Sequence, residues 1–215
     1  DHTVRHRVAA MHRIQSAALL SVGKHFPGHG DTIADSHTEL PTAQAKLETL
    51  WQRELIPFQE LIESGLPSIM SAHILVSAME TACPGTLSPK VISKLLRQEL
   101  GFDGLIITDD MEMGAIMKHY DSSEAAVLAL NAGCDLLLYC HRPDRQLAAR
   151  DGLVKAVLEG RISETRLKQS LTRIDKVRNS LSTLNPPDLG IIGCNNHKEL
   201  VQQVQAMAKN SGQKE

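Results

Sequence analysis

The chain has 215 residues, of which 42% are hydrophobic and 22% charged, with a formal net charge of −2 at pH 7. This balance gives no electrostatic footprint for nucleic acid or for an anionic membrane surface. Three Phe, two Tyr and one Trp are too few for a surface that stacks bases, and no apolar run approaches the roughly 20 residues of a membrane span. The composition is typical of a water-soluble globular protein with an aliphatic core.

Four cysteines, Cys83, Cys134, Cys140 and Cys194, form no CxxC pair and have no His at metal-ligand spacing. We therefore expect reduced cysteines, no metal centre and no cofactor. Reduced cysteines favour the cytoplasm as the location of the protein. Because the chain begins with Asp1 rather than Met, export directed by a preceding segment stays open.

The apolar periodicity predicts alternating helices and strands. The expected helices cover residues 5–15, 43–64, 87–100, 123–131, 144–159 and 163–181, with a weaker one over 199–208. The expected strands cover residues 17–22, 67–77, 104–108 and 134–140. Pro57 lies inside the second helix and predicts either a kink or two shorter helices.

This order, a strand followed by a helix four times over, is typical of a parallel sheet with crossover helices. Such folds keep their sites at the carboxyl ends of the strands. Four units are too few to close an eight-stranded barrel, which takes about 250 residues. The sequence therefore predicts an α/β fold that is either a small open sheet or the second half of a barrel, and periodicity does not separate the two.

The expected domain organisation has a boundary after Leu181. Residues 1–181 carry the strand–helix pattern. From Ser182 the pattern loosens through Asn185, Pro186 and Pro187, which predicts that residues 182–215 form a linker and a weak helix leading toward a second domain.

Residues 24–41, KHFPGHGDTIADSHTELP, concentrate polar side chains in one stretch. Its proline and glycines exclude a helix and predict a loop. Asp35 and His37 are two positions apart, so that a turn can bring the carboxylate to the imidazole, orient the ring and raise its pKa. His37 is then a candidate general acid and base, and the alternative is a solvated surface loop. His25 and His29 stand four apart, but that spacing predicts a metal site only on a helix.

Asp109 and Asp110 follow the apolar run GLIIT, residues 104–108. A strand without alternation is expected where both faces of a sheet are covered. A carboxylate at its end can be held rigidly with one edge open to a ligand. The alternative for these two residues is a helix N-cap or a solvated turn.

Two long motifs, KHFPGHGDTIADSHTELP and GFDGLIITDDMEMGAI, resemble the β-N-acetylhexosaminidase branch of glycoside hydrolase family 3. The first is similar to the family pattern KH-F/I-PGHG, four variable residues, then D-S/T-H; the second is similar to its strand end GF-x-G-apolar-apolar-T/S-D. LSPKVISKLLRQELGFDG and ALNAGCDLLLYC are also similar. The resemblance covers residues 8–181 and implies a (β/α)8 barrel of the TIM type, of which this chain carries roughly the last four strand–helix units.

The resemblance implies a retaining exo-glycosidase that releases terminal β-linked N-acetylglucosamine, with peptidoglycan fragments or muropeptides as substrates. It assigns the nucleophile to Asp109 and the acid/base dyad to Asp35 and His37. The residues assigned to sugar binding are Lys24, His25 and His73. A neutral imidazole repels an incoming anion less than a carboxylate does, which leaves phosphate as an acceptor alongside water. The β-glucosidase branch of the family lacks the D-S-H loop.

Only 23 residues precede the KHFPGHG loop, whereas the family's barrel has further strands there that bring an aspartate and an arginine to the sugar. We therefore expect a fragment of the enzyme. The alternative function is a catalytically incomplete half-barrel that binds sugar weakly or not at all. Exposed sheet edges predict self-association, pairing with a missing half, or instability.

A third interpretation of the sequence is a small doubly wound sheet that binds a phosphorylated metabolite. It requires a glycine-rich turn at a helix N-terminus, for which PGHG is a poor match.

Overall fold

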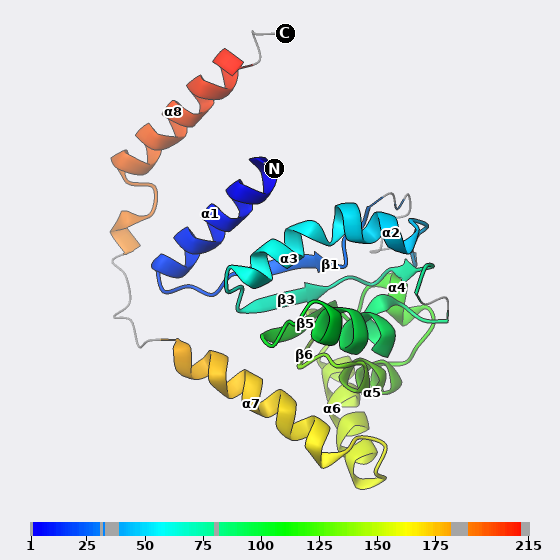
Figure 1. Ribbon diagram of the computed structural model, residues 1–215. Helices are drawn as coiled ribbons and strands as arrows, with labels where there is room; N and C mark the ends of the chain where they lie inside the picture. Colours follow the sequence, from blue (N-terminus) through cyan, green and yellow to red (C-terminus); the bar gives the residue numbers. More distant parts are fainter. Residues whose placement is uncertain (1, 31, 33–38, 80–81, 182–188, 212–215) are drawn as a thin grey trace. The chain divides into compact units, whose positions relative to one another are not determined.

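The computed structural model describes residues 2–30, 32, 39–79, 82–181 and 189–211 (Figure 1). The chain divides into two compact units, Asp1–Leu181 and Ser182–Glu215. Among the described residues, no helix combines the length and apolar character that crossing a membrane requires. The second unit contains the 3-10 turn η4 (Leu189–Ile191) and the helix α8 (Asn195–Ser211).

The first unit alternates helices with short strands. Its helical elements are α1 (His2–Ser16), α2 (Leu47–Thr49), η1 (Leu50–Glu54), α3 (Ile56–Glu63), η2 (Gly85–Leu87), η3 (Lys90–Glu99), α4 (Gly114–Met117), α5 (Ser122–Ala132), α6 (Pro143–Leu158) and α7 (Glu164–Ser180). Its strands are β1 (Val22–Phe26), β2 (Thr42–Ala43), β3 (Ser68–Ser71), β4 (Leu75–Val76), β5 (Leu105–Asp110) and β6 (Leu136–Leu138).

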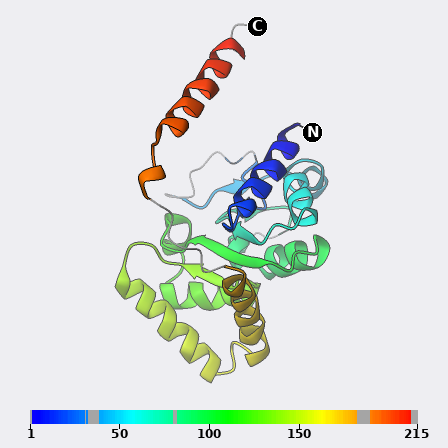
Figure 2. The same ribbon diagram turned by 90° about the vertical axis from the view of Figure 1, so that its left-hand side faces the viewer.

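Four of the strands form one parallel sheet in the order β1-β3-β5-β6, and β2 pairs with β4 in a separate parallel pair. Figure 1 shows the four strands side by side, with α1 and α3 toward β1 and with α6 and α7 toward β6; the view turned by 90° in Figure 2 shows the same distribution. The predicted parallel α/β sheet is confirmed. Because all four strands run the same way, their carboxyl ends share one edge of the sheet.

The first strand lies later in the chain than predicted. The apolar run 17–22 is mostly outside the sheet, and Leu19 in it is 59% exposed. Hydrogen bonding to β3 decides the position, because Phe26 still pairs with Ser71. The strand therefore carries Lys24 and His25, which we predicted to lie in the loop.

The helix predicted over 43–64 is broken into α2, η1 and α3, and α3 begins at Ile56, with Pro57 in its first turn. Proline has no N–H group, which breaks a hydrogen bond in the interior of a helix but not in its first turn. This explains why a new helix begins just before Pro57. The strand predicted over 67–77 is wrong as one element. Its two halves, β3 and β4, pair in different sheets, and residues 72–74 between them form no strand.

The core lies between the sheet and the helices. Phe26, Ile69 and Ile106 of three neighbouring strands are fully buried. Phe26 meets Phe58 of α3 edge to face, with 5.2 Å between ring centroids. Such aromatic pairs add about 0.5–1.5 kcal/mol to the burial of their area, so the end of β1 is fixed firmly against α3.

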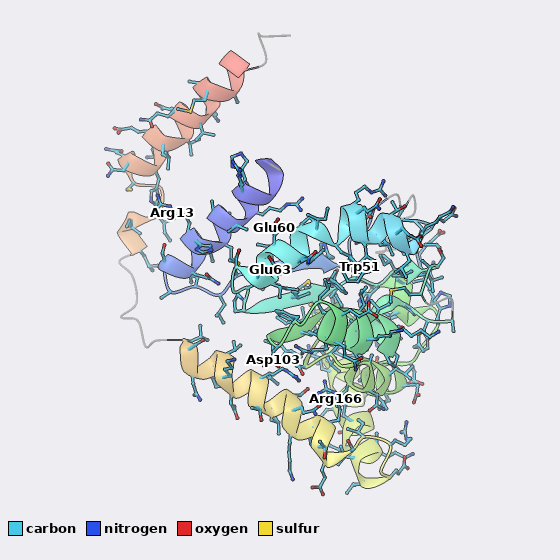
Figure 3. All side chains as sticks on the ribbon, viewed as in Figure 1. Arg13, Trp51, Glu60, Glu63, Asp103 and Arg166 are labelled. Atoms are coloured by element: carbon cyan, nitrogen blue, oxygen red, sulfur yellow. The ribbon has the colours of Figure 1, made fainter. Side chains whose placement is uncertain are left out.

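Asp135, at the start of β6, is the centre of a buried ionic cluster. Its side chain has no exposed area. Its partners are Arg97 at 2.5 Å, Ser170 at 2.8 Å, the amide N of Ile106 at 3.1 Å, Arg166 at 3.2 Å and Arg173 at 3.5 Å. Arg166 lies on α7 and is labelled in Figure 3. The cluster joins η3, β5, β6 and α7 at the amino ends of the strands.

Candidate active site

The carboxyl ends of β1 and β5 bring an imidazole and a carboxylate together. Nε2 of His25 lies 3.5 Å from Oδ2 of Asp109, and the two side chains are 31% and 24% exposed. β3 lies between the two strands in the sheet. The His25 side chain therefore reaches across the end of β3 to Asp109. This pair joins two residues, far apart in the chain, that the sequence assigned to the same site.

Asp109 keeps most of its carboxylate available. Its Oδ1 accepts a hydrogen bond from the amide N of Asp110 at 2.8 Å, and its Oδ2 faces His25. Within the part of the chain that the structure describes, this carboxylate has no ion pair with an arginine or a lysine, and it is about a quarter exposed, so it can approach a ligand. Position and exposure suit a nucleophile or an electrostatic stabiliser.

Asp110 has a different environment from that of its neighbour. Its Oδ1 accepts from the amide N atoms of Glu112 at 3.0 Å and Cys140 at 3.3 Å, and its Oδ2 lies 3.2 Å from Nε2 of His141. These bonds fasten the loop after β6 to the end of β5. Asp110 is not a helix cap, because α4 begins at Gly114 after Met113.

His73 lies beneath the site rather than in it. The residue is 1% exposed, its Nε2 lies 3.0 Å from the carbonyl O of Asp110 and its Nδ1 lies 2.9 Å from Oγ1 of Thr86. Burial lowers the pKa of the imidazole, and hydrogen bonding to Asp110 opposes that effect only in part. The prediction that His73 binds the sugar does not fit this position. The neutral ring donates to Asp110 and so supports the end of β5.

Glu112 is a polar residue that the sequence analysis missed. Its side chain is 2% exposed, and one carboxylate oxygen accepts from the amide N atoms of His141 at 2.5 Å and Arg142 at 3.1 Å. Burial raises the pKa of Glu112, but these backbone N–H groups and nearby Arg145 outweigh burial and hold the pKa below its usual value. Glu112 thus anchors the same loop as Asp110. The only signal in the sequence was a third acidic residue shortly after Asp109 and Asp110.

Lys24 is exposed on β1, next to His25. Both residues line a groove of about 630 Å³ that runs along β1 beside α1 and α3, and Asp109 does not line it. Gly28, His29 and Glu54 also line this groove. The groove is therefore a neighbour of the Asp109 carboxylate rather than the pocket around it.

Asp35 and His37, the predicted acid/base dyad, lie outside the described residues, so their roles remain predictions. The rings of His25 and His29 stand edge to face with centroids 5.6 Å apart. Within the part of the chain that the structure describes, no group of three or more His, Cys, Asp or Glu side chains is arranged to hold a metal ion.

Comparison with known proteins identifies the family of this chain. Residues 2–177 match the family model described as the glycosyl hydrolase family 3 N terminal domain. A β-hexosaminidase from Methylococcus capsulatus is 40% identical over 140 residues, which are 65% of this chain and 42% of that protein. One from Methylobacillus flagellatus is 37% identical over 135 residues, 63% of this chain and 38% of that protein.

Solved structures agree in fold. A glycoside hydrolase family 3 β-N-acetylglucosaminidase from Paenibacillus sp. str. FPU-7 superposes with a TM-score of 0.89 at 42% identity, over 94% of this chain and 39% of that chain. The β-N-acetylglucosaminidase from Thermotoga maritima gives a TM-score of 0.77 at 31% identity, over 84% and 39% of the two chains. The fold is of the (β/α)8-barrel type, with four of its parallel strands present here. This chain spans about two fifths of the length of these relatives.

Proposed function

The chain belongs to glycosyl hydrolase family 3 through that family's N-terminal domain, and from this premise we propose that it carries the catalytic carboxylate of a retaining β-N-acetylglucosaminidase. The observation that carries the proposal is Asp109, which is partly exposed at the carboxyl end of β5 and faces His25 at 3.5 Å. In a barrel of this type the active site lies at that end of the strands. The relatives named β-hexosaminidase and β-N-acetylglucosaminidase support the choice of sugar.

In the proposed first step a carboxylate oxygen of Asp109 attacks the anomeric carbon of the terminal sugar, and the bond from that carbon to the leaving oxygen breaks. The leaving oxygen takes a proton from His37, which Asp35 orients. In the second step neutral His37 removes a proton from water, whose oxygen displaces Asp109 from the anomeric carbon. Two displacements at one carbon return the β configuration. Phosphate is the alternative acceptor in the second step.

Hydrogen bonds to the sugar are proposed for Lys24 and His25, which lie at the end of β1. His25 has a second role in this scheme, because its ring lies beside Oδ2 of Asp109 and helps to fix the direction of that carboxylate. As the substrate we propose a peptidoglycan fragment that ends in β-linked N-acetylglucosamine.

The test is turnover of 4-nitrophenyl N-acetyl-β-D-glucosaminide by this chain and by the chain extended at its N-terminus, each beside its Asp109→Ala variant. We expect an active parent, and a loss of about 10³-fold or more in Asp109→Ala, because the covalent step is removed. An Asp109→Ala variant as active as its parent would overturn the assignment of the nucleophile. An extended chain that cleaves only 4-nitrophenyl β-D-glucoside would overturn the proposed sugar.

The second candidate is a half-barrel that binds the sugar without turning it over. It is supported by the two fifths of the relatives' length that the chain spans. Saturable binding of N-acetylglucosamine, with no release of 4-nitrophenol in either form, is the outcome that this candidate predicts.

A further inference from the structure

Glu54 lies directly beneath the glycine-rich turn that follows β1. It is the last residue of η1, and its side chain is only 5% exposed. A Cβ added at Gly28 would lie 3.2 Å from Cβ of Glu54, and one added at Gly30 would lie 2.8 Å from its Oε1. The two glycines have φ values of +109° and +51°. The backbone of the turn therefore rests on the Glu54 side chain, and a methyl group at position 30 would require the carboxylate of Glu54 to shift.

The two oxygens of the Glu54 carboxylate differ in their surroundings. Oε1 accepts from Nε and Nη2 of Arg53 at 2.6 and 2.5 Å. Oε2 is fully buried and has no hydrogen-bond partner among the residues that the structure describes. A buried carboxylate oxygen without a donor destabilises the fold relative to a satisfied one. An apolar residue would fill the same space at lower cost, so packing alone gives no reason for a carboxylate here.

The turn that rests on Glu54 leads directly to the candidate site. Two backbone hydrogen bonds shape it, from the amide N of Gly28 to the carbonyl O of His25 at 2.8 Å and from the amide N of Thr32 to the carbonyl O of His29 at 3.0 Å. The first of these bonds ends on His25, whose ring lies 3.5 Å from Asp109. A shift of the turn would therefore move the imidazole that faces the carboxylate.

We propose that Glu54, held by Arg53, is a positioning residue. It fixes the position of the Gly28–Gly30 turn and thereby the placement of His25 against Asp109. The inference deepens the proposed function and rests on it for its catalytic consequence. Its structural part, the support of the turn, stands on the described contacts alone. The two parts are tested separately.

The first experiment measures hydrogen exchange at the amides of Gly28 and Thr32 in this chain. Glu54→Ala is expected to speed exchange at both amides by about tenfold or more, because the turn loses its support. Glu60→Ala is the matched control. Glu60 is an exposed residue of α3 that lines a different groove, together with Val8 and His12 of α1, so its loss leaves both amides unchanged. Unchanged protection at both amides in Glu54→Ala would overturn the proposal.

The second experiment is a double-mutant cycle on the same exchange rates. Gly30→Ala alone pushes a methyl group against Oε1, strains the backbone at φ +51° and speeds exchange. In the Glu54→Ala background that oxygen is gone, so only the cost of the positive φ remains and Gly30→Ala adds less. We expect the two changes to be non-additive by about tenfold, as for residues in direct contact. Gly160→Ala is the control, because Gly160 has φ +73° with nothing within 4 Å of an added Cβ. It leaves the two amides unchanged. Additive effects would show that the turn does not rest on Glu54.

The third experiment uses the active form of the protein and separates positioning from general loss of structure. If Glu54 sets the geometry of the His25–Asp109 pair, Glu54→Ala lowers kcat on 4-nitrophenyl N-acetyl-β-D-glucosaminide by about tenfold or more with KM nearly constant. Glu54→Gln, which fills the same space, recovers part of that loss. An equal loss in Glu54→Gln and Glu54→Ala, or a loss confined to KM, contradicts the positioning role. A parent without activity contradicts the proposed function and leaves the exchange results to decide the support of the turn.

Discussion

The two ends of the parallel sheet each carry an aspartate in a cluster of charged groups, but the clusters are built in opposite ways. At the amino ends, Asp135 has no exposed side-chain area and is bonded by arginines, a serine and a backbone amide. At the carboxyl ends, Asp109 is 24% exposed, and its partners among the described residues are one backbone amide and one imidazole at 3.5 Å. The carboxylate of Asp135 is enclosed by its partners, whereas that of Asp109 is partly exposed.

This difference fits a structural role for Asp135 and the chemical role that we propose for Asp109. Burial lowers the pKa of Arg97 to about 10, although Asp135 opposes the shift, so the arginine stays charged at neutral pH and keeps its bond to Asp135. Such a cluster ties α7 to the sheet and offers nothing to a ligand. Around Asp109 the structural hydrogen bonds are made by its neighbours instead. Asp110 and Glu112 hold the loop after β6, and His73 supports the end of β5. The division matches the general rule for barrels, in which the amino-terminal face serves stability and the carboxyl-terminal face serves catalysis.

The largest effect is expected from a substitution of Asp135, which tests the contrast between the two clusters. Asp135→Asn removes the charge that compensates buried arginines and is expected to lower the free energy of unfolding by about 3–5 kcal/mol. Asp109→Asn is expected to change it by less than about 0.5 kcal/mol, as at a surface position. Urea unfolding of both variants beside the parent measures this contrast. Equal destabilisation by the two substitutions would show that the two clusters do not divide the roles in this way.

The sequence predicted the parts of this picture that depend on local pattern. The apolar run 104–108 identified β5, and the carboxylates after it marked its end. Asp135 was not singled out, although it stands as a single charge between Cys134 and Leu136 in an apolar segment. The resemblance in the two long motifs assigned Asp109 and His25 to one site, and the structure places them 3.5 Å apart; their roles remain predictions.

The sequence could not predict contacts that depend on packing between distant elements. His25 reaches Asp109 across the end of β3, and no spacing in the chain fixes that distance. Glu54 follows two polar residues on a broken helix, so nothing local marked it as buried beneath a glycine turn. His73 was misjudged for the same reason, since an imidazole at a strand end is equally consistent with a ligand contact and with a bond to the next strand.

A smaller effect is expected at His73, where the lowered pKa makes the stability of the fold depend on pH. Burial lowers its pKa in the folded state, so the unfolded chain binds the extra proton first as the pH falls. The free energy of unfolding is therefore unaffected by His73 above the ordinary pKa of 6.5. Below that pH it falls progressively, with a slope of up to about 1.4 kcal/mol per pH unit. Glu112 has a pKa below its ordinary value of 4.5, so its contribution to stability is complete above that pH and is lost only as the pH falls below it.

The measurement is the free energy of unfolding between about pH 7.5 and pH 5, a range that spans the ordinary pKa of histidine, for the parent, His73→Gln and the control His119→Gln at an exposed histidine. We expect the parent and His119→Gln to lose stability alike as the pH falls below 6.5, and His73→Gln to lose less. The same slope in all three proteins would contradict the assignment of a neutral, buried His73 beneath Asp110.

The central claim, that Asp109 forms a covalent bond to the sugar, is tested most directly by trapping. A fluorinated N-acetylglucosaminide with a good leaving group slows the second step of a retaining reaction and lets the intermediate accumulate. Mass spectrometry of the peptide that contains residues 104–118 is predicted to show one sugar attached at Asp109, and no adduct in Asp109→Ala. An adduct on Asp110, or release of sugar with the inverted configuration and no adduct, would contradict the account.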